Sequence, residues 1–428
     1  MRIYRTAVLY VFAIALPAGA QDQKPTDAAD WNWAALHESA VVHFNASRFA
    51  QALDASEAAL PLATTAGQRA MTASDIGYAL SGLGRNIEAM AQFERSLATW
   101  RNIDPAGHIA IRIAISLART QQALNRYAGA EQTLRTAVEA RPRDNESLAS
   151  VLNALGDLLD RQGRLAEARD HFAAALKISS LRGENRATAL IGVADVDRCM
   201  RRWKPSIDQS NEALALARDM KNPVLEALAL MVLGNTWSDM DDAARAEPPL
   251  KRALAIFEKI SSGGPEYAVT LTSLGVVYVH EGKYGLAEDA FNRALGGDAK
   301  AANSFNAGTL EFLAVLMSKE KRFGEAAEFA SRAYGVVLSA FDEDNPQTAS
   351  ALTTMAFVEQ RAGNLDKAER HYAEALRIMR KHDTLDSTGG LEIMQNYAIV
   401  LRKLHRGREA KSVSAELKTF RSTSKPAH

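Results

Sequence analysis

Cysteine is almost absent from this chain. Cys199 is the only cysteine among 428 residues. No disulfide can therefore form within the chain, and the fold must be stabilised by packing alone. Two interpretations of Cys199 are left: it forms a disulfide with another chain, or, more simply, it is a buried or unused thiol.

The chain also has few aromatic residues and no excess of positive or negative charge. Aromatic residues make up 7% of the chain, and 51 Lys plus Arg balance 51 Asp plus Glu. A balanced chain is not expected to bind nucleic acid or an anionic membrane surface. The hydrophobic residues, 47% of the total, are mainly Ala and Leu, which favour helices that pack closely through small side chains.

Signatures of catalysis, cofactor binding and metal binding are missing as well. The chain has no G-x-x-x-x-G-K phosphate loop and no G-x-S-x-G nucleophile turn, and its 9 His lack metal-ligand spacing. His37 and His43 stand six residues apart, not four as on a zinc protease helix. Asp342, Asp344 and Asn345 lack the glycine and glutamate of a calcium loop. We therefore predict no catalytic residue, no cofactor, no metal and no enzymatic activity.

Residues 1–20 have the three parts of a secretory signal peptide. Arg2 and Arg5 precede an apolar run that ends at Leu16, and small residues up to Ala20 suit cleavage. The run is shorter than the roughly 20 residues that span a bilayer, so a signal peptide is preferred to a membrane anchor. We expect export to the periplasm or the medium, with no membrane span after cleavage.

One residue pattern recurs along the rest of the chain. A small residue is followed by Ala or Ser twelve residues later, often by a large apolar residue four further on, and usually by Ala three after that. The small residues are Ala40, Gly77, Ala118, Gly156, Ala194, Gly234, Gly275, Ala314, Ala356 and Ala398. Their spacings of 37 to 42 residues indicate ten repeats of one structural unit.

Each repeat has the pattern of a helical hairpin. Gly163, Gly282 and Gly363 stand between the two small positions of their repeats, where a positive φ can end one helix before the next begins. Small residues at the facing positions let the two helices approach closely. Large residues such as Phe172 and Phe291 are expected to fill the space toward the next hairpin. The sequence therefore predicts an all-α fold built as an α-solenoid.

The pattern resembles the tetratricopeptide repeat, and within that superfamily the longer repeats of about 42 residues found in kinesin light chains. The segments that carry the resemblance are Ala246–Ile256, Thr270–Tyr278 and Asp344–Ala349. The resemblance implies a right-handed superhelix of helical hairpins and an exported bacterial protein. We expect a flexible leader at 21–30, the array of about ten repeats at 31–421, and a disordered tail at 422–428.

The chain also departs from its relatives. The paired asparagines that kinesin-light-chain-like repeats carry before the small residue remain only in part, at Asn153 and Asn396. No repeat carries the Lys, Arg and Asn set with which chaperone-binding members hold a partner's terminal carboxylates. The resemblance therefore implies a fold and does not identify a partner.

First helices line the concave surface of such a solenoid, and repeat proteins bind partners there. If this chain follows the family pattern, the residues one and four after the small residue, and two and three before it, face the groove. In the fourth to sixth repeats these positions include polar residues, mostly acidic or amide: Asn153, Asp157, Asp160, Asp195, Arg198 and Asn235. In the seventh to ninth repeats they include apolar residues: Val276, Val279, Phe312, Val315 and Phe357. The alternative is that the Val and Phe residues pack between hairpins and the Asp residues form a solvated face.

The leading functional prediction is a non-catalytic scaffold that binds a protein or peptide partner in its groove. A partner segment with Lys or Arg at one end and two or three apolar anchors at the other would complement both halves. Two alternatives stay open: a regulatory subunit or an enzyme whose helical active site carries no motif, and a self-assembling structural array. The sequence does not predict the identity of the partner or the oligomeric state.

Overall fold

The fold is known from a computed structural model, which describes residues 28–178, 183–261, 264–296, 304–340, 343–382, 385 and 388–423. The predicted signal peptide lies outside the described residues, as do most of the predicted leader and most of the predicted tail. The first described helix begins at Ala28 and the last ends at Thr423.

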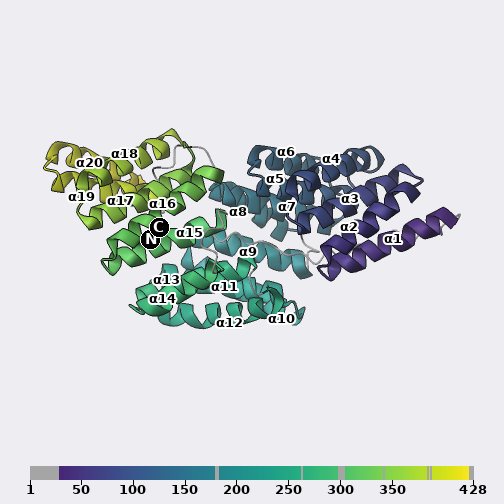
Figure 1. Ribbon diagram of the computed structural model, residues 1–428, viewed down its shortest axis with the longest axis horizontal. Coiled ribbons are helices and arrows are strands. Elements are labelled where there is room, and N and C mark those ends of the chain that lie inside the picture. Colours follow the sequence, from purple (N-terminus) through teal and green to yellow (C-terminus); the bar gives the residue numbers. More distant parts are fainter. Residues whose placement is uncertain are drawn as a thin grey trace. The chain divides into compact units, whose positions relative to one another are not determined.

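The described residues form twenty α-helices and one short 3-10 helix, and they contain no strand. The helices alternate as first and second members of ten hairpins (Figure 1). The first helices are α1 (Ala28–Asn45), α3 (Ala66–Gly82), α5 (His108–Ala123), α7 (Asn145–Arg161), α9 (Gly183–Cys199), α11 (Pro223–Asp239), α13 (Pro265–His280), α15 (Ser304–Lys319), α17 (Pro346–Ala362) and α19 (Thr388–Lys403). The second helices are α2 (Phe49–Ala59), α4 (Asn86–Ile103), α6 (Tyr127–Glu139), α8 (Leu165–Leu176), α10 (Trp203–Asp219), α12 (Ala243–Ser261), α14 (Tyr284–Ala294), α16 (Phe323–Ala340), α18 (Leu365–Lys381) and α20 (Gly407–Thr423). The 3-10 helix, η2 (Leu60–Leu62), follows α2.

The chain divides into two compact units, and the boundary falls within α11. We call the residues up to Val232 the N-terminal unit and those from Leu233 on the C-terminal unit. One continuous hydrophobic core runs through the first five hairpins of the N-terminal unit, from Ala52 to Val196. Two core clusters, spanning 276–358 and 349–417, fill the hairpins of the C-terminal unit.

The turn inside each hairpin has the same backbone conformation in all ten repeats. A residue with φ between 56° and 89° stands seven positions after each predicted small residue: Ser47, Gly84, Asn125, Gly163, Arg201, Asp241, Gly282, Lys321, Gly363 and His405. Around Gly163, for example, the backbone N–H of Arg164 donates to Leu159 O at 2.9 Å and that of Gly163 to Asp160 O at 2.9 Å. This pair of bonds satisfies the last carbonyls of the first helix. The predicted repeat register is therefore confirmed throughout.

The small residues do face the second helices. A Cβ added to Gly156 would stand 2.9 Å from the ring of Phe172, and one added to Gly275 would stand 2.4 Å from the ring of Phe291. Phe172 also touches the first helix of the following hairpin, because a Cβ on Gly192 would meet its ring at 2.4 Å. The predicted role of the large residue, which fills the space toward the next hairpin, is confirmed at Phe172.

Consecutive hairpins stack in both units, because second helices contact the first helices that follow them, as α4 contacts α5 and α16 contacts α17. First helices also contact one another: α5 with α7 and α7 with α9 in the N-terminal unit, and α13 with α15 and α15 with α17 in the C-terminal unit. Among the described residues, neighbouring second helices have no comparable backbone approach. Because the first helices stand closer together, they lie on the inner side of each stack. We call this side of each unit its first-helix face.

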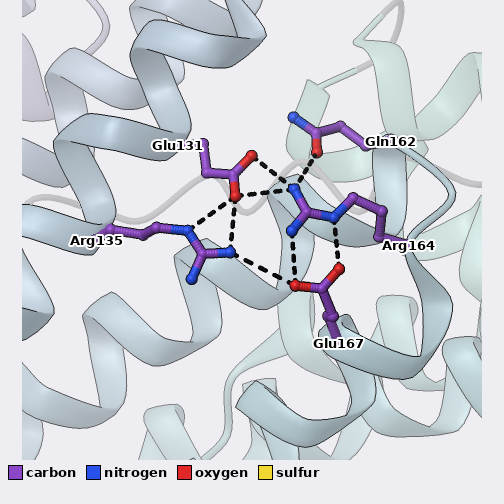
Figure 2. Close-up of polar contacts among 5 residues, drawn as sticks. All are labelled: Glu131, Arg135, Gln162, Arg164 and Glu167. Atoms are coloured by element: carbon purple, nitrogen blue, oxygen red, sulfur yellow. Dashed lines mark hydrogen bonds and ion pairs between the residues drawn. The ribbon is translucent and has the colours of Figure 1, made fainter.

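Second helices are linked instead by long ionic side chains, as Figure 2 shows for the third and fourth repeats. Arg164, the residue before α8, donates to Glu167 one turn on at 2.6 Å and to Glu131 on α6 at 2.7 Å. Arg135 pairs with the same Glu131 at 2.7 Å, and Gln162 accepts from Arg164 at 3.2 Å. Burial raises the pKa of Glu131, but the hydrogen bonds from Arg135 and Arg164 outweigh it and hold that pKa below its usual value. In the C-terminal unit the same arrangement recurs at Arg322 with Glu288 and Glu325, and at Arg406 with Glu369 and Glu409.

Candidate partner-binding face

The first-helix face of the N-terminal unit presents a narrow stripe of half-exposed side chains. On α5 between Ala110 and Gln121, only Arg112, Ser116 and Arg119 are not buried. On α7 between Ala149 and Arg161, the half-exposed residues are Ser150, Ala154, Asp157 and Arg161. Residues three and four apart share one side of a helix. The small residues of α5 and α7 point toward the second helices, so these stripes lie on the opposite side, next to each other.

A polar and aromatic cluster joins this face at the first three repeats. The ring of Trp33 on α1 stacks on His37, with centroids 5.1 Å apart, and its indole N–H donates to the Thr72 hydroxyl of α3 at 2.9 Å. His37 Nδ1 and Asp75 Oδ2 are hydrogen-bonded at 2.6 Å, and their side chains are 16% and 7% exposed. Arg112 on α5 stands near enough for its charge to act on both His37 and Asp75. First helices from three repeats thus contribute to one cluster.

The His37 and Asp75 side chains shift each other's pKa. Burial lowers the pKa of His37, but the hydrogen bond and the charge of Asp75 outweigh it and raise this pKa above its ordinary value. Burial raises the pKa of the Asp75 carboxyl, and its contacts with His37 and Arg112 offset this only in part. The hydrogen bond between His37 and Asp75 links α1 of the first hairpin to α3 of the second, and its strength depends on the protonation of both groups.

We expect the docking of α1 to weaken as the pH rises. A histidine whose folded pKa is raised stabilises the fold fully below its unfolded value of about 6.5, and this stabilisation is lost as the pH passes the folded pKa. The raised pKa of Asp75 acts in the same direction. Hydrogen exchange in α1, corrected for intrinsic rates, should therefore be faster at pH 8.5 than at pH 6.0. The increase in exchange rate should be smaller in a His37→Gln variant than in the wild-type protein. An equal increase in the variant and the wild type would contradict the role of His37 in holding α1.

The predicted polar groove residues are mostly inside the fold. Asn153 is buried and donates to Asn185 O at 3.0 Å, and Asp160 is buried as well. Asp195 and Arg198 are both buried and pair with each other at 2.8 Å. Asn235, which lies in the C-terminal unit, is also buried.

Asp157 is half-exposed on the α7 stripe and pairs with Arg161, one turn on, at 2.9 Å. Asp157 and Asp195 thus already have arginine partners. They do not offer the bare negative charge that a basic partner segment would need.

The predicted apolar groove residues divide in the same way. Val276, Phe312 and Val315 are buried, and the Phe312 ring stacks on Phe291 with centroids 5.9 Å apart. Val279 and Phe357 are half-exposed on α13 and α17. Contact of these residues with a partner stays a prediction, and Val279 and Phe357 are the two of this set that reach the surface.

Asp344, in the acidic loop before α17, is paired with two basic side chains. Asp344 accepts from Arg377 at 2.5 Å and pairs with Lys381, and these two partners lower its pKa to about 2. Asp342, the other acid of that loop, lies outside the described residues. Among the described residues, no three His, Cys, Asp or Glu side chains gather closely enough to hold a metal ion. No described helix has both the length and the apolar character needed to cross a bilayer.

Sequence reasoning did not single out His37 and Asp75 as a pair, nor Arg112 at all. The signal was present in the repeat numbering, because these residues stand 38 and 37 positions apart, close to one repeat length. A search for ionisable residues at corresponding places of successive first helices would have grouped them. Their types alone indicate nothing.

Comparison with known proteins gives the family. A sequence profile described as tetratricopeptide repeat matches residues 68–143, 147–219, 225–300, 306–381 and 349–416. No curated protein sequence matches the chain significantly.

Among solved structures, a Rap protein complexed with competence and sporulation factor has a similar fold. The TM-score is 0.59 at 14% identity, over 84% of this chain and 99% of that one. BtubC (BKLC) from P. vanneervenii has 25% identity and a TM-score of 0.41, over 50% of this chain and 89% of that one. A tetratricopeptide repeat protein from Parabacteroides merdae has 16% identity and a TM-score of 0.44, over 62% of this chain and 93% of that one. Because the profile matches far more than half of the residues and the hairpins recur in register, the chain belongs to the tetratricopeptide repeat family and is an all-helical repeat scaffold.

Proposed function

We propose that this scaffold binds a segment of another protein on the first-helix face of its N-terminal unit and performs no catalysis. The observation that supports the proposal is the stripe of half-exposed, mostly polar side chains on α5 and α7, together with the Trp33 and His37 cluster of α1; residues 70–80 of α3, the helix between them in the repeat order, are buried. Two adjacent first helices that expose side chains offer a surface of the kind that repeat proteins use for binding. The Rap structure, a complex with competence and sporulation factor, supports the view that this fold can hold a partner.

The proposal is tested by selecting binders from a displayed library of random twelve-residue peptides with the wild-type protein. Two variants carry the same change on opposite sides of the unit: Ala154→Arg on the α7 stripe and Ala128→Arg on the exposed side of α6. We expect Ala154→Arg to lower the affinity for selected peptides at least tenfold and Ala128→Arg to leave it unchanged. Equal affinities for the two variants would place binding elsewhere and refute the proposal.

Export and membership of the kinesin-light-chain-like subgroup belong to the same proposal. Support for export comes from Arg2, Arg5 and the short apolar run before Ala20. Support for the subgroup comes from the repeat spacing of 37 to 42 residues. N-terminal sequencing of the protein from its producing cell decides the first point: a chain that starts after Ala20 is expected, and one that starts at Met1 in the cytoplasm would overturn it.

A further inference from the structure

The stripe of half-exposed side chains on α5 and α7 has buried counterparts on α3. On α5 and α7 the stripe residues stand six and two positions before the small residue of the repeat and one position after it. On α3 these three positions hold Met71, Asp75 and Tyr78, which are 7%, 8% and 7% exposed. A partner that follows the stripe from α7 to α5 would therefore meet a closed surface at α3.

Three side chains of α1 lie against this part of α3: Trp33, His37 and Phe44. Their spacing of four and seven residues places them on one side of α1. The Trp33 indole N–H donates to the Thr72 hydroxyl at 2.9 Å. His37 is hydrogen-bonded to Asp75 at 2.6 Å, and the ring centroids of Phe44 and Tyr78 are 5.9 Å apart. Side chains of α1 thus contact two of the three stripe positions of α3.

The helix that makes these contacts is itself weakly held. Among residues 32–45 of α1, only Ala40 is buried, whereas α3 buries every residue from 70 to 80. Val42, on another side of α1, is 53% exposed. A helix with few buried side chains can open locally at a low cost in free energy. Its hydrogen bond from His37 to Asp75 also depends on protonation, so its docking responds to conditions.

We propose that α1 is a displaceable cover of α3, and that the partner segment takes its place when it binds the first-helix face. This inference rests on the proposed function and names the regulation of its site. With α1 displaced, the stripe would run over α3, α5 and α7 without interruption. The apparent affinity for the partner then equals the intrinsic affinity multiplied by the fraction of molecules in which α1 is open.

The first experiment supplies α1 separately, as a synthetic peptide of residues 28–45. Its affinity is measured for the full-length wild type, for Trp33→Ala, which removes the bond to Thr72, and for the control Val42→Ala. Because Trp33→Ala weakens the built-in cover, it should bind the peptide about tenfold more tightly than the other two proteins do. A peptide that itself carries the Trp33→Ala change should bind more weakly. Equal affinities of the α1 peptide for the three proteins would refute the cover.

The second experiment uses the twelve-residue peptides selected for the proposed function. Those that bind the first-helix face should bind Trp33→Ala about fivefold more tightly than wild type. The α1 peptide should displace them from the Trp33→Ala protein. Unchanged or weaker binding would refute this inference and leave the proposed function standing, because the Ala154→Arg comparison tests that function separately. A library that yields no binder would refute both.

A change of pH tests the cover without any substitution. The charged groups that act on His37 are Asp75 on α3, Arg112 on α5 and Glu38 on α1 itself. Because the docking of α1 is expected to weaken as the pH rises, wild type should bind histidine-free selected peptides more tightly at pH 8.5 than at pH 6.0. The gain should be smaller in His37→Gln. A wild-type affinity that stays constant or falls over this range would contradict the cover.

Discussion

Gly275→Leu is expected to destabilise the C-terminal unit by about 3 kcal/mol, the upper end of the overpacking range. Gly275 lies on α13, where even a Cβ would stand 2.4 Å from Cε1 of Phe291. The Phe291 ring is fully buried and stacks on Phe312, so it cannot swing aside without disturbing the next repeat. Leucine adds three further carbons in the same place. Urea denaturation of the full-length protein, followed by circular dichroism, measures the loss.

The matched control is Gly282→Ala, seven residues later in the same hairpin. Gly282 has a φ of 73°, and no atom lies within 4 Å of the position that its Cβ would take. A side chain there meets only the backbone penalty of the left-handed region, about 1 kcal/mol. Equal losses for Gly275→Leu and Gly282→Ala would mean that the glycine contacts described above do not hold the hairpin together.

The repeat register could be predicted because it depends on steric size. Only small residues fit where α13 crosses α14 or α7 crosses α8, and that requirement is visible as Gly or Ala at a fixed spacing. The turns were harder to foresee. Glycine occupies this place at Gly163, Gly282 and Gly363, but Arg201 and Lys321 adopt the same left-handed conformation. In these turns two backbone hydrogen bonds impose a conformation that the residue type does not reveal.

The candidate site could be predicted only in outline. At roughly 100° per residue around a helix, the half-exposed positions of α7, Ala154 and Asp157, lie on one side of its axis. Asn153 and Asp160, three before and four after the small residue, point nearly a quarter-turn away and are buried. A family-based position rule therefore selected first helices and, for Asp157, Val279 and Phe357, positions that are half-exposed. It could not identify the cluster of His37, Asp75 and Arg112, which depends on contacts between repeats.

Phe312→Ala is expected to destabilise the C-terminal unit by about 3 to 5 kcal/mol, the cost of removing a buried aromatic ring from a packed core. Phe312 is 3% exposed and packs in the cluster that joins the seventh, eighth and ninth repeats. Removing its ring leaves Phe291 without a stacking partner and opens a cavity between α14 and α15. Denaturation in urea, compared with wild type, gives the change in free energy of unfolding.

Comparing Phe357→Ala with Phe312→Ala distinguishes a role in the core from a role in partner binding. Phe357 is half-exposed on α17, so its removal should cost less than half as much stability as the removal of Phe312. If Phe312 acts only through the core, its variant binds selected peptides with unchanged affinity once the folded fraction is taken into account. Interface anchors behave in the opposite way, with a loss of about 2 kcal/mol or more in binding and little loss of stability. A Phe312→Ala protein that melts like wild type but no longer binds would show that the ring leaves the core to meet a partner.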